Sequence, residues 1–364
     1  MTQPAVATES LRAMLEDKPR RLRVPSMRGL LPRGRAGRIA LSLALQGGGA
    51  HGAFTWGVLD RLLEEETIDI KAVSGTSAGA INAVALASGW RQGGREGARA
   101  SLDRLWRTVG REAARTPLGH GGFAIFALGL ATHLFSPYEL NPFDIHPLRQ
   151  LLNELVDFAA LRERSPVPLL IAATQVRTGE CRIFREHELT ADMVLASSCL
   201  PQLHHAIEIE GEAYWDGGYT SNPPVLELAE LGRSRTLLVL RINPTNGKGL
   251  PHSAPAIRNR TAEIVFGRPL AIELAQLEKI RCFGRGLLGS LQPRLRRLAR
   301  LDLQIIDGEE TLARLDPITK LVPDIEMLER LRAEGRAAAE AWLRRQPRED
   351  LLPRISRQEA RNHP

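Results

Sequence analysis

Residues 39–80 decide the fold and read IALSLALQGGGAHGAFTWGVLDRLLEEETIDIKAVSGTSAGA. An apolar run of strand length, 39–46, ends in three glycines, and apolar residues then recur at helical spacing over 52–65. A second short strand, 70–73, leads into another tight turn and an alanine-rich helix over 78–88. The pattern of strand, turn and helix occurs twice in succession, which predicts the start of a parallel βαβ arrangement.

Further strands and helices are predicted downstream of this start. Strands are expected at 169–175, 181–184, 206–210, 236–242 and, at a sheet edge, 301–306, and helices at 257–290 and 323–345. Buried strands that alternate with helices are typical of a parallel sheet covered on both faces. The sequence therefore predicts an α/β fold, a three-layer α/β/α sandwich with a mainly parallel central sheet.

The domain organisation follows from changes in composition along the chain. Its 364 residues, 43% hydrophobic and 25% charged, suit one large domain with extensions. We expect a basic, poorly ordered arm over 1–37, a core domain over 38–310 and a helical, Arg-rich extension over 311–364. Residues 91–140 do not fit the alternation, and their apolar run is either a lid over a binding site or a core helix.

The charge distribution bears on partners. The formal net charge is +7, and residues 1–40 carry nine Lys and Arg against three Asp and Glu. Residues 281–364 are also basic, with 17 against 13. Basic ends favour peripheral contact with an anionic membrane, although a solvated Arg-rich surface has the same composition. Because no zinc-finger spacing or RNP pattern accompanies the charge, nucleic acid is not an expected partner.

The cysteines and the hydropathy of the sequence indicate the cellular compartment in which the protein is expected. The three cysteines, Cys181, Cys199 and Cys282, have no CxxC spacing, which argues against a disulfide framework and a metal site. No stretch has the basic and apolar regions of a signal peptide, and none reaches the ~20 apolar residues of a membrane span. We expect a cytoplasmic protein that contacts membranes only peripherally.

The turn at 75–79 carries the pattern GxSxG between a strand and a helix. At such a turn the serine oxygen stands exposed above the sheet. Glycines permit the tight turn and let the helix and the neighbouring strand approach closely. Ser77 is therefore a candidate nucleophile, with a purely structural Gly/Ser-rich turn as the alternative.

The turn at 47–52, GGGAHG, exposes backbone N–H groups that can donate hydrogen bonds to a developing oxyanion. The same letters match the GxGxxG fingerprint of dinucleotide-binding folds. That fingerprint requires an acidic residue at the end of the next strand. Here the GxSxG turn takes that position and Asp69 precedes the strand, so a dinucleotide site is disfavoured and no cofactor is expected.

A third motif, Asp216-Gly217-Gly218, is by itself a common turn. Together and in this order, however, the three motifs resemble the patatin-like phospholipase family, whose pattern is a glycine-rich loop, GxSxG and a distant DGG or DGA. The resemblance covers about residues 38–245 and includes Pro201 and the strand end Arg241-Ile242-Asn243-Pro244, which look like bacterial members. The chain departs from the pattern at His51, where the loop commonly carries Arg or Lys.

The resemblance implies a patatin-like fold and a serine acyl hydrolase that cleaves fatty-acyl esters of phospholipids or other lipids. It implies a Ser–Asp dyad, in which Ser77 attacks the ester and Asp216 accepts its proton, without a metal or cofactor. His51 is expected to line the site or to brace the loop. The remaining implied residues are the oxyanion-hole glycines Gly47, Gly48 and Gly49 and the supporting glycines Gly52, Gly75, Gly79, Gly217 and Gly218.

The sequence is also compatible with other mechanisms and functions. A Ser–Asp–His triad would need a histidine after Asp216, and only His252 and His363 follow, in a Pro-flanked loop and in the terminal tail. His204 and His205 precede the acid, and we expect them to be structural or to lie near the mouth of the site. The same scaffold also suits an esterase, a thioesterase, an acyltransferase or a non-catalytic lipid-binding protein.

Overall fold

The computed structural model describes residues 38–115, 136–142, 146–247, 249–285, 292–315, 317–321 and 323–346. The predicted arm over 1–37, the apolar run 121–135 and the tail beyond 346 lie outside these residues. The strands are β1 (Ile39–Leu45), β2 (Ile68–Thr76), β3 (Leu169–Gln175), β4 (Cys181–Arg185), β5 (Ile207–Ile209), β6 (Glu212–Asp216), β7 (Thr236–Arg241) and β8 (Asp302–Asp307). All seven predicted strands are present, and β6 is an addition to them.

The helices include the predicted ones, most with shifted ends. They are α2 (Gly52–Glu64), α3 (Ala78–Arg115), α5 (Pro137–Leu140), α6 (Pro147–Leu155), α7 (Phe158–Arg164), α8 (Ala191–Ser197), α9 (Val225–Leu231), α10 (Ala254–Gly284), α12 (Pro293–Ala299), α13 (Glu309–Leu312) and α14 (Ile325–Arg345). Short 3-10 turns are η1 (Gly49–His51), η3 (Gly217–Tyr219) and η4 (Pro317–Lys320). Side-chain caps explain two of the helix starts: Ser253 accepts from the Ala256 N–H, and Asp324 accepts from the Met327 N–H.

The strands form one eight-stranded sheet in the order β5-β6-β3-β2-β1-β7-β8, with β4 paired to β3. Strands β3, β2, β1, β7 and β8 are parallel to one another, whereas β4 and β6 pair antiparallel with β3, and β5 pairs antiparallel with β6. The predicted edge strand is β8, which pairs only with β7 among the described strands. The sheet is therefore mixed but mostly parallel, as the sequence predicts.

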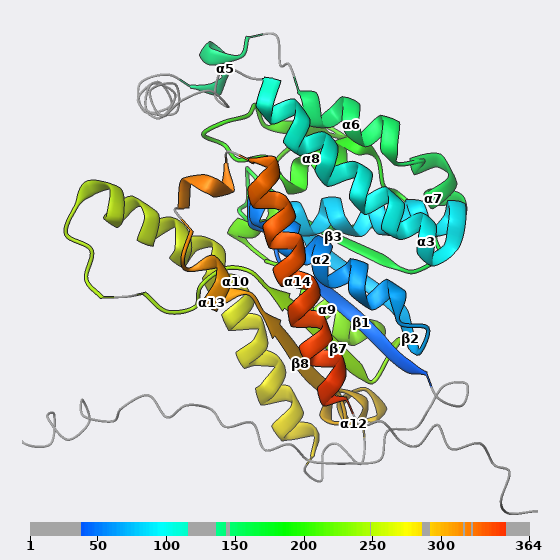
Figure 1. Cartoon of the computed structure of the whole chain (residues 1–364). Helices are drawn as coiled ribbons and strands as arrows, with labels where there is room; N and C mark the ends of the chain where they lie inside the picture. The colour runs from blue at the N-terminus through cyan, green and yellow to red at the C-terminus, as the bar shows by residue number, and fades with distance from the viewer. Residues whose placement is uncertain are drawn as a thin grey trace, which may run out of the picture. The chain divides into compact units, whose positions relative to one another are not determined.

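Helices cover both faces of this sheet (Figure 1). On one face, Leu41, Leu43 and Leu45 of β1 pack in a core with helices that include α2, α3 and α14. On the other face, Ala44 packs in a second core with α9, α10 and α12. This division follows from the two-residue period of a strand, which sends successive side chains to opposite faces. The prediction of a three-layer α/β/α fold is confirmed.

The first part of the irregular region, residues 91–115, completes the long helix α3. The backbone departs from helical geometry at Gly93 and Gly94 and then continues as helix. Beyond this kink, Leu102, Leu105 and Trp106 are buried in the same core as α2. This part of the region is thus core helix, and residues 116–135 lie outside the described residues.

The C-terminal helix α14 packs along α2, and Figure 1 shows the two running side by side. The crossing is close, because a Cβ on Gly57 would lie 2.0 Å from the carbonyl oxygen of Arg332. A Cβ on Gly335 would likewise lie 2.1 Å from the carbonyl oxygen of Phe54. The two helices therefore touch backbone to backbone, and α14 is part of the packing on this face of the sheet.

A buried carboxylate stabilises the packing of α14 on α2. Asp60 on α2, with a side chain 2% exposed, accepts from Arg99 Nε at 2.7 Å and from Arg332 Nη2 at 3.0 Å. Arg336 also donates to it. Burial alone would raise the pKa of Asp60, but the hydrogen bonds from the three arginines hold it below its ordinary value. The network ties α3 and α14 to α2.

We predict that Asp60→Asn lowers the free energy of unfolding by about 3–5 kcal/mol, because it removes the buried negative charge that three half-buried arginines share. The control is Glu112→Gln, which removes an exposed ion pair with Arg115 and should cost less than about 1 kcal/mol. Urea denaturation at neutral pH measures both. Because the Asp60 pKa is lowered, its contribution is present above the ordinary value and is lost on acidification. Equal effects of the two variants would contradict this account.

Candidate active site

The GxSxG turn holds Ser77 in a strained conformation. Ser77 lies between β2 and α3 with a φ of 55°, in the left-handed region that costs a non-glycine residue roughly 1–3 kcal/mol. A Cβ on Gly79 would lie 2.0 Å from the carbonyl oxygen of Leu45, so only glycine fits beneath the turn. The Ser77 N–H donates to Ser197 Oγ at 3.0 Å. Ser77 is half-exposed at this turn.

The strand register brings Asp216 to the same level of the sheet. Thr76 pairs with Ala172 of β3, and the next residue, Ala173, pairs with Asp216 at the end of β6. The Asp216 N–H donates to the carbonyl oxygen of Cys199 at 2.7 Å. Two residues separated by more than a hundred positions in the chain are therefore held one strand apart, across β3.

Asp216 is buried, with 1% of its surface exposed, and its Oδ1 accepts the Gly218 N–H at 2.7 Å. Burial raises the pKa of this carboxyl to about 7, and the hydrogen bonds from the Gly218 N–H and the Ser77 side chain oppose the rise. The carboxylate thus has a hydroxyl as its neighbour and titrates near neutral pH. Such a group can accept a proton at neutral pH, which a carboxyl of ordinary pKa near 4 does poorly.

The glycine-rich loop follows β1 and approaches Ser77 directly. A Cβ on Gly47 would lie 2.7 Å from the Ser77 Cβ. The Gly47 N–H donates to Asn222 Oδ1 at 2.7 Å and is therefore occupied. Within the described residues, Gly48 and Gly49 have no acceptor for their N–H groups, and both are at least partly exposed. Of the three glycines expected to donate to an oxyanion, two thus have N–H groups available.

Polar side chains from neighbouring strand ends hold this loop in place. Gln46 Oε1 accepts the N–H groups of Ile242 and Asn243 at 2.8 and 2.9 Å. Asn243 Nδ2 donates to the carbonyl oxygen of Gly47 at 2.5 Å. Sequence reasoning gave no role to Gln46, Asn243 or Ser197. A polar residue directly after a buried strand, as at Gln46 and Asn243, is the signal that would have indicated the first two.

His51 is buried at the C-terminal end of η1. Its Nε2 lies 2.8 Å from Thr319 Oγ1, and its Nδ1 has no partner in the part of the chain that the structure describes. Burial, followed by the positive charge of Lys320, lowers the pKa of His51 to about 4. The residue therefore braces the loop against η4 as a neutral ring.

The remaining glycines named from the motifs lie at close contacts around the same site. Gly52 begins α2, and a Cβ there would meet the Ala78 Cβ at 2.8 Å. A Cβ on Gly217 would lie 2.2 Å from the carbonyl oxygen of Ala172 in β3. Gly218 supplies its N–H to Asp216, and Gly75 lies against the Gly79 carbonyl oxygen.

The hydrogen bonds that the structure gives the Asp216 carboxyl come from Gly218 and Ser77. His252 is exposed in the segment before α10, and His363 lies outside the described residues. His204 stacks on His146, and His205 stacks on Tyr138. These rings therefore connect the loop before β5 to α5 and to the start of α6. The structure therefore places the Asp216 carboxyl in hydrogen-bond contact with the Ser77 side chain.

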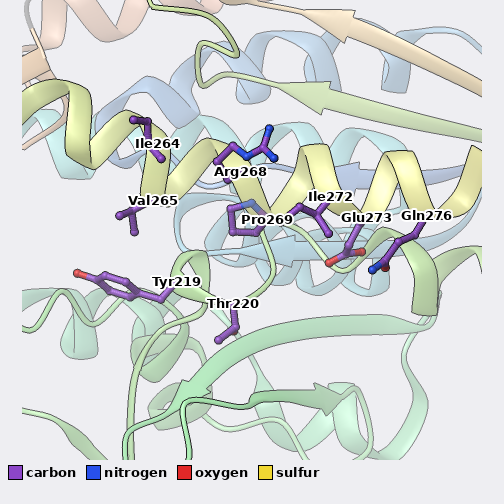
Figure 2. A pocket seen from close by; sticks show the side chains of 9 residues that line it. All are labelled: Tyr219, Thr220, Ile264, Val265, Arg268, Pro269, Ile272, Glu273 and Gln276. Atoms are coloured by element: carbon purple, nitrogen blue, oxygen red, sulfur yellow. The ribbon is translucent and has the colours of Figure 1, made fainter. Parts of the chain in front are cut away.

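A hollow of about 490 Å³ lies beside the site, between η3 and α10 (Figure 2). Ile264 and Ile272 on its α10 side are 45% and 46% exposed. Glu273, which also lines it, accepts the N–H groups that begin α9, from Val225 at 2.6 Å and Leu226 at 3.0 Å. The complete lining is Tyr219, Thr220, Ile264, Val265, Arg268, Pro269, Ile272, Glu273 and Gln276.

Two features of the described residues bear on cofactors and membranes. No group of three or more His, Cys, Asp or Glu side chains among them is arranged to hold a metal ion. None of the described helices has both the length and the apolar character needed to span a bilayer.

Comparison with solved structures returns proteins of low sequence identity. VipD from Legionella pneumophila is 16% identical with a TM-score of 0.41, and the match covers 86% of this chain and 69% of VipD. The ExoU–SpcU complex of Pseudomonas aeruginosa is 18% identical with a TM-score of 0.38, covering 85% of this chain and 52% of the matched one. The chain thus spans about half the length of that second protein. No curated protein matches the sequence significantly.

The sheet is mixed, mostly parallel and covered on both faces, and a serine turn, a glycine loop and an aspartate lie at the ends of its inner strands. This is a patatin-like fold. Residues 43–229 match the family model described as patatin-like phospholipase, which is 187 of the 364 residues. The chain belongs to the patatin-like phospholipase family, and membership supports a lipid hydrolase.

We predict that Asp216→Asn raises stability relative to the native protein, and that the gain grows with pH. Because the Asp216 pKa is raised from 3.8 to about 7, its favourable contribution is complete below the unfolded value and is lost as pH rises through about 7. The loss is on the order of 4 kcal/mol. Urea denaturation of both proteins at pH 5 and pH 8 measures the part of this loss that falls above pH 5, roughly 2–3 kcal/mol. A difference that does not change with pH would contradict the raised pKa.

Proposed function

We propose that the protein is a serine acyl hydrolase that cleaves fatty-acyl esters of lipids through a Ser77–Asp216 dyad. The observation that carries the proposal is the contact between the Ser77 side chain and a buried carboxyl whose pKa is about 7. A serine hydroxyl is a weak nucleophile until a neighbouring base takes its proton. Asp216 is the base that the geometry supports best.

In the first step, Ser77 Oγ attacks the ester carbonyl carbon while its proton passes to Asp216. The carbonyl oxygen becomes an oxyanion, and the N–H groups of Gly48 and Gly49 are the donors proposed for it. Because the Gly47 N–H is bound to Asn222, Gly47 is proposed to shape the loop instead of donating. When the carbon–oxygen ester bond breaks, the alcohol leaves with the proton from Asp216, and the acyl group stays on Ser77.

In the second step, water attacks the acyl-enzyme while Asp216 again accepts a proton. Collapse of the second tetrahedral intermediate releases the fatty acid and returns the proton to Ser77 Oγ. Burial of Asp216 serves both steps, since a carboxyl with a pKa near 7 is matched to proton transfer at neutral pH. The mechanism requires no group beyond the chain's own residues and water.

Two features support a lipid as the substrate in preference to a small soluble ester. One is the family to which the chain belongs. The other is the apolar side of the hollow between η3 and α10, where Ile264 and Ile272 are nearly half-exposed close to the turn that follows Asp216. Exposed apolar side chains beside a site are typical of a surface that receives an apolar ligand.

We predict that the purified protein releases fatty acid from phospholipid micelles, and that Ser77→Ala and Asp216→Asn each lower the rate about 10³-fold or more. Titration of the released acid measures the rate. Circular dichroism and thermal unfolding establish that both variants remain folded.

The matched control is Ser101→Ala, which removes a buried hydroxyl on α3 that lies outside the site. It should keep the native rate. Full activity in Ser77→Ala would refute the nucleophile, and a preference for short soluble esters over micelles would refute the lipid substrate.

A further inference from the structure

The glycine-rich loop has no charged side chain of its own. Its one titratable residue is His51, whose pKa is lowered to about 4, so the ring is uncharged at neutral pH. The oxyanion proposed to form beside Gly48 and Gly49 therefore gains no positive charge from the loop. Any positive charge near this oxyanion must therefore come from a segment outside the glycine-rich loop.

Lys320 brings a positive charge to the loop from η4, far along the chain. Its Nζ donates to Asn243 Oδ1 at 2.8 Å. The same Asn243 uses its Nδ2 to donate to the carbonyl oxygen of Gly47 at 2.5 Å. The side chain of Lys320 is thus linked to the loop through a single amide, and this amide is oriented because both of its ends are engaged.

The backbone of Lys320 touches the other end of the loop. Gly49 has a φ of +59°, and a Cβ there would lie 2.2 Å from the Lys320 carbonyl oxygen. The neighbouring residue, Thr319, lies 2.8 Å from His51 Nε2. Three contacts from two consecutive residues of η4 therefore reach Gly47, through Asn243, and Gly49 and His51 directly.

Titratable groups of α10 and of the glycine-rich loop interact with Lys320. Burial lowers the pKa of Lys320, and the carboxylate of Glu263 on α10 opposes that shift. On the loop side, burial lowers the pKa of His51, and the positive charge of Lys320 lowers it further. A half-buried ammonium acts over a longer range than an exposed one, because the surrounding medium screens it less.

We propose that Lys320 is a positioning residue of the oxyanion loop, which it holds through Asn243 and Gly49 and supplies with the positive charge that the loop lacks. The inference rests on the proposed hydrolase function and adds to it a requirement for the segment around η4. The charge favours the oxyanion over the neutral ester, so its effect should fall on kcat more than on KM.

The test compares Lys320→Met, Lys320→Gln and Lys320→Arg with the native enzyme on a soluble p-nitrophenyl ester. Lys320→Met and Lys320→Gln should lower kcat about 10- to 100-fold with little change in KM, and Lys320→Arg should restore much of it. Lys320→Gln keeps a donor for Asn243 without a charge, and so separates the hydrogen bond from the charge. The control is Lys279→Met, an exposed lysine on α10, which should keep the native kcat.

A pH profile gives a readout that a merely structural role would not move. Native activity should fall at alkaline pH as Lys320 loses its proton, below the ordinary lysine value of 10.5. In Lys320→Arg this fall should move to higher pH, because arginine keeps its proton. Hydrolysis in the presence of Ser77→Ala is subtracted as the blank.

The outcomes separate this inference from the function on which it rests. An active native enzyme with unchanged kcat in Lys320→Met, or with the same alkaline limb in Lys320→Arg, overturns the role of Lys320 alone. A folded native protein that neither hydrolyses esters nor reacts with a fluorophosphonate overturns the proposed function, and the inference with it.

Discussion

The site depends on one constraint, the burial of the Asp216 carboxyl against the Ser77 hydroxyl. Burial raises the pKa of Asp216 to about 7, which a solvated aspartate would not reach. The fold maintains this costly arrangement through the register of β2, β3 and β6 and through the close contacts of Gly79 and Gly217 with neighbouring backbone. Strain at Ser77 and desolvation at Asp216 are both offset by the packed layers around them, since such features persist only where the surrounding structure enforces them.

Much of this arrangement could be predicted from the sequence, because its causes are local. The strand-turn-helix pattern of residues 39–80 determines where Ser77 and the glycine loop lie, and the DGG motif identifies Asp216. The sequence could not show that the Gly47 N–H is occupied by Asn222, since that contact joins residues 175 positions apart. It also left open whether the insertion at 91–140 is a lid or a core helix, because the glycines at 93 and 94 interrupt the helical pattern; the structure shows that 91–115 is core helix.

The C-terminal segment connects stability to the site. Helix α14 is held on α2 by the Asp60 network and by the crossing at Gly57 and Gly335. The turn η4, which precedes α14, places Thr319 and Lys320 against the loop that begins η1. Charged residues that look like a solvated surface in the sequence thus include a lysine at the loop and arginines on a buried carboxylate. A sequence pattern does not distinguish these roles, because the partners are distant in the chain.

The central claim is that Asp216 activates Ser77, and the rate at which a fluorophosphonate labels Ser77 across pH 5–9 tests it most directly. Mass spectrometry of the labelled peptide identifies the residue and gives the rate at each pH. The account predicts a single adduct on Ser77 whose rate of formation rises with pH through about 7, as Asp216 loses its proton, and is nearly abolished in Asp216→Asn. Labelling at another residue, or a rate at Ser77 that is independent of pH and of Asp216, would contradict it.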